Sequence, residues 1–215
     1  MFSTTTARTA GSVLVAATVL FGVAACGSDE PAEPSPPSPT SQAVDPTAPP
    51  EQVTWQAYQS IDLPSSAVSG PRSASPASGY TQSPQGAALA AIQTTVRIST
   101  APDNQWAAQV RSSVTPGAGR DAFMINRAQL SISPGAPQDD ARPTVRGYVM
   151  RDYNDQRATV DIITSYSDDS VLSTTARMLW RDGDWKLILP DPAEQLETQT
   201  ALEEIPSEMT ALEAP

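Results

Sequence analysis

The stretch ARMLWRDGDWKLIL, residues 176–189, decides the fold class, because it is typical of two β-strands joined by a tight turn. Every second side chain is apolar on both sides of Asp182-Gly183, as in strands that bury one face. Glycine supplies the positive φ that a type I′ turn needs. A two-residue loop at this point places Trp180 opposite Trp185. The sequence therefore predicts an antiparallel hairpin with both tryptophans on one face.

Two more strands are predicted upstream of this hairpin. Apolar and polar residues alternate over residues 145–149 and again over residues 158–162. Asn154-Asp155 lies between these segments and is a candidate for a second two-residue turn. Together with the hairpin, these segments predict an antiparallel meander of four strands.

The turns also predict how the strands pair. A loop at Asn154-Asp155 places Val149 opposite Val160. The next loop is longer, and we choose the register that places Val160 opposite Met178, because it aligns apolar residues with apolar residues. A slip of one residue would move every side chain of a strand to the other face.

The opposite face of the predicted meander carries Tyr148, Asp161 and Arg177 in a row across three strands. In a dry pocket, Asp161 could act as a base and Tyr148 as a proton donor. The alternative is structural, with Asp161 and Arg177 forming a cross-strand ion pair on a solvated face. Trp180 and Trp185 likewise either line a ligand pocket or fill the core.

Three helices are expected before the sheet, over residues 84–99, 102–113 and 119–130. The first has the clearest start, because Ser83 can serve as its N-cap and Pro84 suits its first position. Helices followed by an antiparallel meander indicate an α+β fold, with N-terminal helices packed on a curved four-stranded sheet.

Composition divides the chain into five expected segments. They are a lipoprotein signal peptide (1–25), a lipid anchor with a Pro/Ser-rich disordered linker (26–50), an irregular arm (51–83), the α+β domain (84–190) and an acidic tail (191–215). The linker should be extended and stiff because of its prolines. The tail could form a frayed helix near residues 193–204.

The chain's only cysteine, Cys26, ends an apolar N-terminal stretch. Residues 11–25 would rise only about 22 Å as a helix, which is too short to cross about 30 Å of hydrocarbon. A short apolar segment after a basic start indicates a signal peptide. Val23, Ala24 and Ala25 before the cysteine resemble a bacterial lipobox, which implies diacylglycerol and N-acyl groups on Cys26. The alternative is a plain secretory peptide followed by a buried cysteine.

Two further resemblances concern the folded part. Helices on one face of a curved sheet resemble the nuclear-transport-factor-2-like, or cystatin-like, cone over about residues 84–190. That resemblance implies a pocket between helices and sheet, in which some members of the group transfer protons.

A narrower resemblance is carried by small residues, prolines and aromatic residues in the first half of the chain. These are Trp55, Leu63-Pro64, Gly70-Pro71, Gly79-Tyr80, Ser83-Pro84, Gly86-Ala87 and Ala90-Ala91. They resemble an uncharacterised actinobacterial family that is often lipid-anchored and sometimes accompanies conjugative or integrative elements. No catalytic residues are assigned in that family, so the resemblance implies none here.

Charge and composition exclude several kinds of partner. The formal net charge is −11, from 24 acidic and 13 basic residues, whereas nucleic-acid binding needs clustered Lys and Arg. The chain has no histidine and one cysteine, so neither a cofactor nor a Cys/His metal site is expected. The acidic balance would also repel anionic headgroups, so membrane attachment would depend on the lipid.

These observations predict a non-enzymatic lipoprotein on the outer face of the cell membrane. It would act as a binding or assembly module of the envelope, or of a transfer or secretion apparatus, with other envelope proteins as partners. The alternative is a lipid-tethered carrier or enzyme that binds a small apolar ligand in the cone pocket. A closed cavity beside a buried carboxylate would favour the alternative, whereas a filled core with an exposed apolar groove or sheet edge would favour the module.

Overall fold

The computed structural model describes residues 45–135 and 142–213. The chain divides into two units, Met1–Ser41 and Gln42–Pro215. The first unit lies outside the described residues, so all residues described below belong to the second unit. The predicted signal peptide and the predicted lipidation site also lie outside them, including Val23, Ala24, Ala25 and Cys26. None of the helices described is both long enough and apolar enough to span a bilayer.

The described part has an α+β fold, as predicted, with three helices packed against a mainly antiparallel sheet. The helices are α1 (Pro84–Thr100), α2 (Trp106–Ser113) and α3 (Ala118–Arg127), with a 3-10 turn η1 (Pro192–Glu194). The strands are β1 (Val53–Tyr58), β2 (Ile61–Ser66), β3 (Ser73–Ala74), β4 (Ala77–Ser78), β5 (Thr144–Asn154), β6 (Arg157–Ser165), β7 (Val171–Arg181), β8 (Asp184–Ile188), β9 (Gln199–Leu202) and β10 (Thr210–Ala211).

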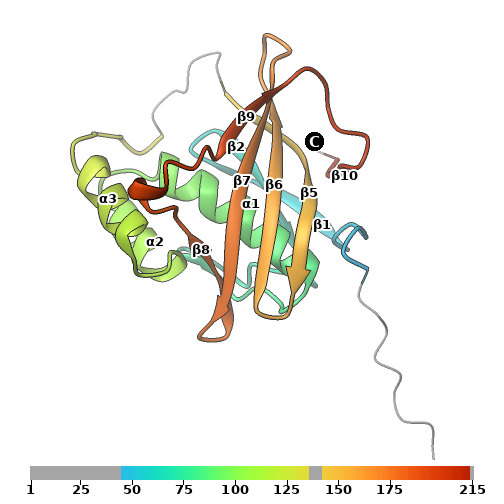
Figure 1. The fold of residues 1–215 in the computed structure, drawn as a ribbon, viewed down its shortest axis with the longest axis horizontal. Helices are drawn as coiled ribbons and strands as arrows, with labels where there is room; N and C mark the ends of the chain where they lie inside the picture. Colours follow the sequence, from blue (N-terminus) through green and yellow to red (C-terminus); the bar gives the residue numbers. More distant parts are fainter. Residues whose placement is uncertain (1–44, 136–141, 214–215) are drawn as a thin grey trace, which may run out of the picture. The chain divides into compact units, whose positions relative to one another are not determined.

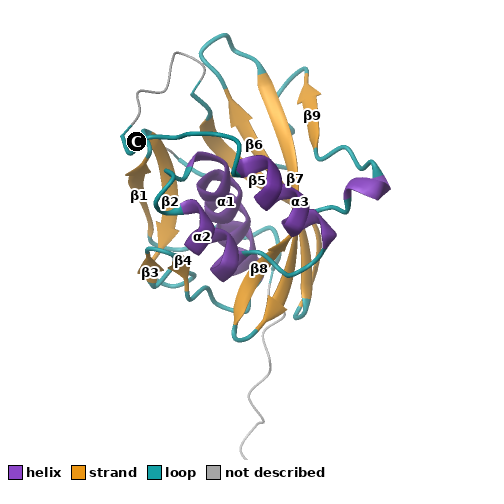
Figure 2. Cartoon of the chain, turned by 90° about the vertical axis from the view of Figure 1, so that its left-hand side faces the viewer, coloured by secondary structure: helices purple, strands orange, loops and turns teal. Residues whose placement is uncertain are grey.

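Helix α1 is the central element of the core. Its predicted start is confirmed, because the Ser83 hydroxyl accepts a hydrogen bond from the Gly86 N–H at 3.0 Å and Pro84 occupies the first turn. The helix contacts β2 on one side and β5 to β8 on the other, so it lies between the β1–β2 hairpin and the main sheet (Figure 2). Buried alanines over residues 87–91 allow both layers to approach the helix closely.

The main sheet has the strand order β10-β5-β6-β7-β8 (Figure 1). Strand β9 also pairs with β7, along its first residues, whereas β8 pairs with its last residues. It contains the predicted meander, which runs from β5 to β8. The predicted hairpin register is confirmed, because Trp180 pairs with Trp185. Asp182 and Gly183 both have positive φ, at 55° and 75°, as a type I′ turn requires.

The predicted β5–β6 register is wrong. Val149 pairs with Asp161 instead of Val160, because the turn lies one residue later than predicted and a bulge between Met150 and Asp152 reverses part of that shift. Asn154 closes this turn rather than occupying it. Its side-chain oxygen accepts hydrogen bonds from the backbone N–H groups of Gln156 and Arg157, which lie two and three residues later, both at 2.9 Å.

The predicted β6–β7 register is wrong by two residues. Val160 pairs with Ala176 rather than Met178, and Met178 pairs with Ala158. A shift of two leaves the same side chains on the core face, so the predicted alternation survives. The loop sets the shift, because the Tyr166 N–H donates to the Ser170 carbonyl at 3.0 Å and closes it tightly.

Residues 51–83 differ from the irregular arm that we expected. They form the β1–β2 and β3–β4 hairpins. Ile61, Leu63 and Tyr80 from this segment are buried in the core beside α1. In β2, Ile61 and Leu63 lie on either side of a polar residue and give the hairpin one apolar face to bury. The many serines and prolines of residues 51–83 make this alternation hard to recognise from composition alone.

The two ends of the described unit also pack against it. Residues 45–50, expected within the linker, contact α1, because the Gln85 amide donates to the carbonyl of Ala48 at 2.9 Å. Residues 191–215, expected as an acidic tail, contribute η1, β9 and β10 instead of a helix near 193–204. Leu212, one of the apolar residues in this acidic segment, is buried in the core.

Candidate functional site

The three residues predicted to form a row across the sheet are not brought together. Tyr148 pairs with Ile162 and is fully buried in the core. Asp161 is the next residue before Ile162 on β6, so its side chain points to the other face of the sheet. Arg177 pairs with Thr159, two residues away from Asp161. The predicted acid–base pair of Asp161 and Tyr148 is therefore split between two faces.

The carboxylate of Asp161 is hydrogen-bonded to two neighbouring side chains. Its carboxylate accepts hydrogen bonds from Arg151 Nε and from the Thr175 hydroxyl, both at 2.6 Å. The predicted ion pair with Arg177 is wrong, because Arg177 lies 3.6 Å from Glu194 instead. The hydrogen bond that Arg151 donates to Asp161 raises the pKa of Arg151. Both carboxylate oxygens of Asp161 are thus engaged, as a buried carboxylate requires.

Tyr148 is placed to remain protonated. Burial raises the pKa of its hydroxyl to about 12, and the hydroxyl donates a long hydrogen bond, 3.4 Å, to the Ala48 carbonyl. The carbonyl belongs to the segment that leads into β1, so this contact ties the start of the described unit to β5.

Trp180 and Trp185 pack edge to face, with ring centroids 5.4 Å apart. Trp185 is fully buried, and its indole N–H donates to the Thr81 carbonyl at 2.9 Å. Trp180 is half-buried at the rim of the same cluster. Of the two roles left open by the sequence, the core role describes Trp185.

An open groove of about 520 Å³ lies beside β5 and β10. Its apolar part includes Ile205 and Met209, and Ile205 is 37% exposed. Charged side chains also line it, with Arg146 from β5 and Glu213 beyond β10. The full lining is Thr144, Val145, Arg146, Ile205, Met209, Ala211, Leu212 and Glu213.

The groove is built by the C-terminal segment lying along β5. The Leu212 N–H donates to the Arg146 carbonyl at 2.9 Å, and the Trp55 indole N–H donates to the Glu213 carbonyl at 2.6 Å. Gly147 allows this approach, because a side chain there would collide with the carbonyl oxygen of Thr210. A contact between residues 158 positions apart in the sequence therefore helps to hold this segment in place.

A second depression of about 230 Å³ adjoins the groove, because both are lined by Thr144 and Val145. It adds Trp55 and Arg142, so an aromatic side chain and a further cation extend the surface. Among residues 45–135 and 142–213, no three histidine, cysteine or acidic side chains are grouped to hold a metal ion. Together the groove and the depression present apolar, aromatic and charged side chains on one surface.

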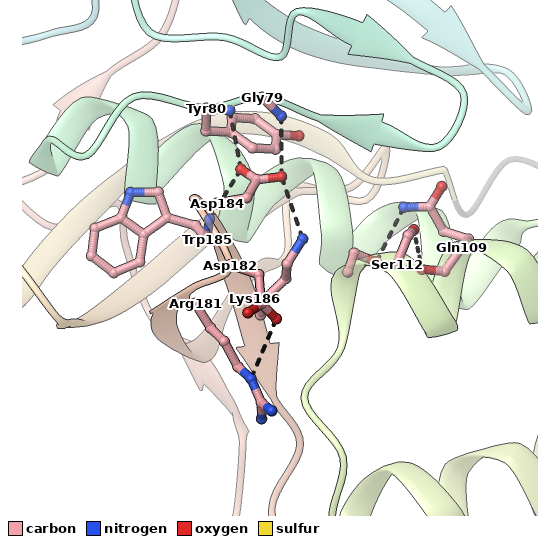
Figure 3. A network of polar contacts seen from close by, with 10 residues as sticks. Gly79, Tyr80, Gln109, Ser112, Arg181, Asp182, Asp184, Trp185 and Lys186 are labelled. Carbon is pink, nitrogen blue, oxygen red and sulfur yellow. Dashed lines mark hydrogen bonds and ion pairs between the residues drawn. The ribbon is translucent and has the colours of Figure 1, made fainter. Parts of the chain in front are cut away.

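Sequence reasoning missed a buried carboxylate, Asp184, at the start of β8. It accepts backbone hydrogen bonds from Tyr80 at 3.1 Å, Gly79 at 3.1 Å and its own neighbour Trp185 at 3.0 Å (Figure 3). The ammonium of Lys186 lies 3.4 Å from the same carboxylate. Tyr80 is 104 residues away in sequence, so no local motif reveals this contact.

Comparison with known proteins gives a match to one family model. A family model described as "Domain of unknown function (DUF8175)" matches residues 22–207. No curated protein and no solved structure matches the chain.

Proposed function

The chain belongs to the family described as Domain of unknown function (DUF8175), and for this member we propose a binding role at the cell envelope. The proposed protein is a lipid-anchored, non-enzymatic module on the outer face of the cell membrane. It binds another envelope protein through the groove beside β5 and β10. Components of a transfer or secretion apparatus are among the envelope proteins proposed as partners.

The lipid anchor is supported by the sequence around Cys26. An aliphatic residue and two small residues precede this cysteine, and a proline-rich segment follows it. The part of the chain that the family model matches begins at residue 22, so it includes this motif. Two or more acyl chains on Cys26 would hold the protein at the membrane without a basic surface.

The binding role is carried by one observation, the exposed apolar part of the groove. Ile205 and Met209 line a depression of about 520 Å³ that has charged residues on its rim. Apolar surface surrounded by polar groups is typical of protein interaction sites. An apolar side chain of a partner would lie against Ile205 and Met209, and polar groups on either side of it would meet Arg146 and Glu213.

The rival function, a carrier or enzyme with a cone pocket, has less support. The likeness to the nuclear-transport-factor-2-like cone and to the actinobacterial lipoprotein family is part of our proposal, and the cone would place a ligand between helices and sheet. In the described residues that space holds large buried side chains, among them Tyr148, Trp185 and Met178. Asp161, the carboxylate expected beside a pocket, is bonded to Arg151 on the other face.

The proposal is tested by photo-crosslinking in intact cells. A photoreactive amino acid, p-benzoylphenylalanine, replaces Ile205 in the groove or, as a matched control, Ile125 on α3. Ile125 is 66% exposed but does not line the groove. We expect a discrete crosslinked protein from position 205 and none of that size from position 125. Combining the position 205 probe with Cys26→Ser should release the chain from membranes and abolish the crosslink.

Two outcomes contradict the proposal. Equal crosslinking from positions 205 and 125 would show that the groove is not the contact. Membrane attachment that persists in a cleaved Cys26→Ser protein would remove the support for the lipid anchor.

A further inference from the structure

A third pocket, distinct from the groove and from the depression beside it, gathers positive charge. It has a volume of about 250 Å³ and lies between the α2–α3 turn and the β7–β8 hairpin. Four of the 13 basic residues of the chain line it, including the only lysine. These residues are Arg111, Arg120, Arg181 and Lys186. Such a cluster is unexpected in a chain of net charge −11.

The fold holds the two walls of this basic pocket together. Thr115, in the turn between α2 and α3, donates its backbone N–H to the Leu187 carbonyl at 2.9 Å. The Thr115 hydroxyl donates to the same carbonyl at 3.3 Å, and Val114 forms a bridge with Leu187. The helix turn is therefore fixed to the outer edge of β8, and the arginines of both helices are held near the hairpin.

The nearby carboxylates only partly compensate these cations. Arg181 and Arg120 lie 3.4 Å and 3.8 Å from Asp182 and Asp121, which are their own neighbours in sequence. These two aspartates are 82% and 68% exposed, so water screens their charges. Arg111 forms no ion pair within the described part of the chain.

Lys186 retains hydrogen-bonding capacity although it faces Asp184. The Asp184 carboxylate already accepts from three backbone N–H groups, and the ammonium of Lys186 lies at a longer distance, 3.4 Å (Figure 3). An ammonium has three donors, so two remain for another acceptor. The Lys186 side chain is mostly buried, which strengthens its attraction for an anion.

A further donor without an acceptor in the described part of the chain belongs to Arg120, which lines the same pocket. Arg120 Nε is buried and has no hydrogen-bond acceptor among the residues described. Pro116 precedes α3 and Arg120 lies in its first turn, and the N-cap residue of the helix, Gly117, has no side chain to accept from that turn. The N-terminus of a helix carries partial positive charge, which adds to that of the four cations.

We propose that this basic pocket binds an oxyanion of the phosphate type. Guanidinium groups present paired N–H donors that match the oxygens of phosphate, and a lysine ammonium adds a point charge. The phosphate group belongs either to free inorganic phosphate or to the diester headgroup of a phospholipid. The site uses none of the groove residues, so it stands independently of the proposed protein-binding function.

The test is isothermal titration calorimetry of the full chain in neutral detergent at constant ionic strength. Inorganic phosphate and glycerophosphoglycerol, the soluble headgroup of phosphatidylglycerol, serve as separate probes. We expect saturable binding of at least one of them. Arg111→Gln and Arg181→Gln should each weaken that binding about tenfold, as the loss of one charge-assisted hydrogen bond predicts.

Arg157→Gln is the matched control, because Arg157 is exposed and lines neither the basic pocket nor the groove. It should leave the affinity unchanged. Arg111 is exposed and Arg181 is half-exposed, so neither substitution is expected to prevent folding. Tighter binding of the diester would identify a lipid headgroup as the source, and tighter binding of inorganic phosphate the free ion. Absence of saturable binding to both probes, or an equal loss in Arg157→Gln, would overturn the proposal.

Discussion

Asp161 and Asp184 are the two aspartates that the described residues bury, and each is stabilised in a different way. Asp184 depends on backbone N–H groups of residues 79, 80 and 185. Asp161 depends on two side chains, Arg151 and Thr175. Burial of a carboxylate is unfavourable unless hydrogen bonds replace those of water, so both arrangements are requirements of the fold.

Arg97 shows the opposite situation, a buried cation that forms no ion pair in the described part of the chain. Its guanidinium stacks over the Tyr58 ring at 4.2 Å, and its Nε donates to the Gln93 amide oxygen at 2.7 Å. Burial lowers the pKa of Arg97. A cation–π contact thus takes the place of a carboxylate and joins α1 to β1.

The substitution Asp161→Asn should reduce the free energy of unfolding by about 1 kcal/mol, because an amide cannot accept both short hydrogen bonds with a full negative charge. The loss stays moderate because Arg151 is half-exposed and therefore partly solvated. Urea denaturation measures the change. Arg177→Gln, which removes only an exposed ion pair at 3.6 Å, should change stability by less than half as much. A larger effect for Arg177→Gln would contradict this assignment.

At the scale of the elements, the shortest strand pairing has a large effect on the surface. β10 pairs with β5 only at Thr210 and Ala211, yet it forms one wall of the groove. The pairing depends on close approach at Gly147, where a side chain would meet the Thr210 carbonyl. Leu212 anchors the end of the segment in the core.

Gly147→Ala should therefore displace β10 and open the groove while the meander stays folded. Overpacking of this kind costs about 1–3 kcal/mol. Limited proteolysis with mass spectrometry should show faster cleavage between residues 203 and 213 in the variant. Thr144→Ala, an exposed substitution on the same strand, should leave the cleavage rate unchanged. Equal protection of the segment in Gly147→Ala and the unmodified protein would contradict the close-approach argument.

At the scale of the whole described unit, one core unites segments that composition separates. Leu63 from β2, the alanines of α1, Val160 from β6 and Leu212 near the C-terminus belong to a single buried cluster. The helices and the meander alone would leave the inner face of α1 without its partner hairpin. The folding unit is therefore longer at both ends than residues 84–190.

Leu63→Ala tests this unity. Leu63 is fully buried, and its truncation should lower the free energy of unfolding by about 2–5 kcal/mol if the hairpin is part of the core. Val68→Ala is the control, because Val68 is 45% exposed in the same segment and its truncation should have an effect within about 0.5 kcal/mol. Denaturation curves for both variants provide the measurement. A small effect for Leu63→Ala would return residues 51–83 to the role of a detachable arm.

The candidate sites were less predictable than the fold. The groove depends on Ile205 and Met209, whose presence in an acidic segment was the only sequence signal available. The basic pocket draws on α2, α3 and the β7–β8 hairpin, so its cations lie up to about 75 positions apart and form no motif. Sites assembled from distant elements depend on tertiary contacts that alternation and turn residues do not specify.

The sequence by itself determined the helix start at Ser83-Pro84, the type I′ hairpin at Asp182-Gly183 and the α+β order of elements. These features depend on interactions between residues close in the chain, where caps and turns have strong chemical preferences. Only the tertiary structure decided the β5–β6 and β6–β7 registers, the burial of residues 51–83 and the placing of β9 and β10. Those features depend on which distant surfaces fit together, since a bulge, a small residue or one buried leucine can shift the balance without changing the local pattern.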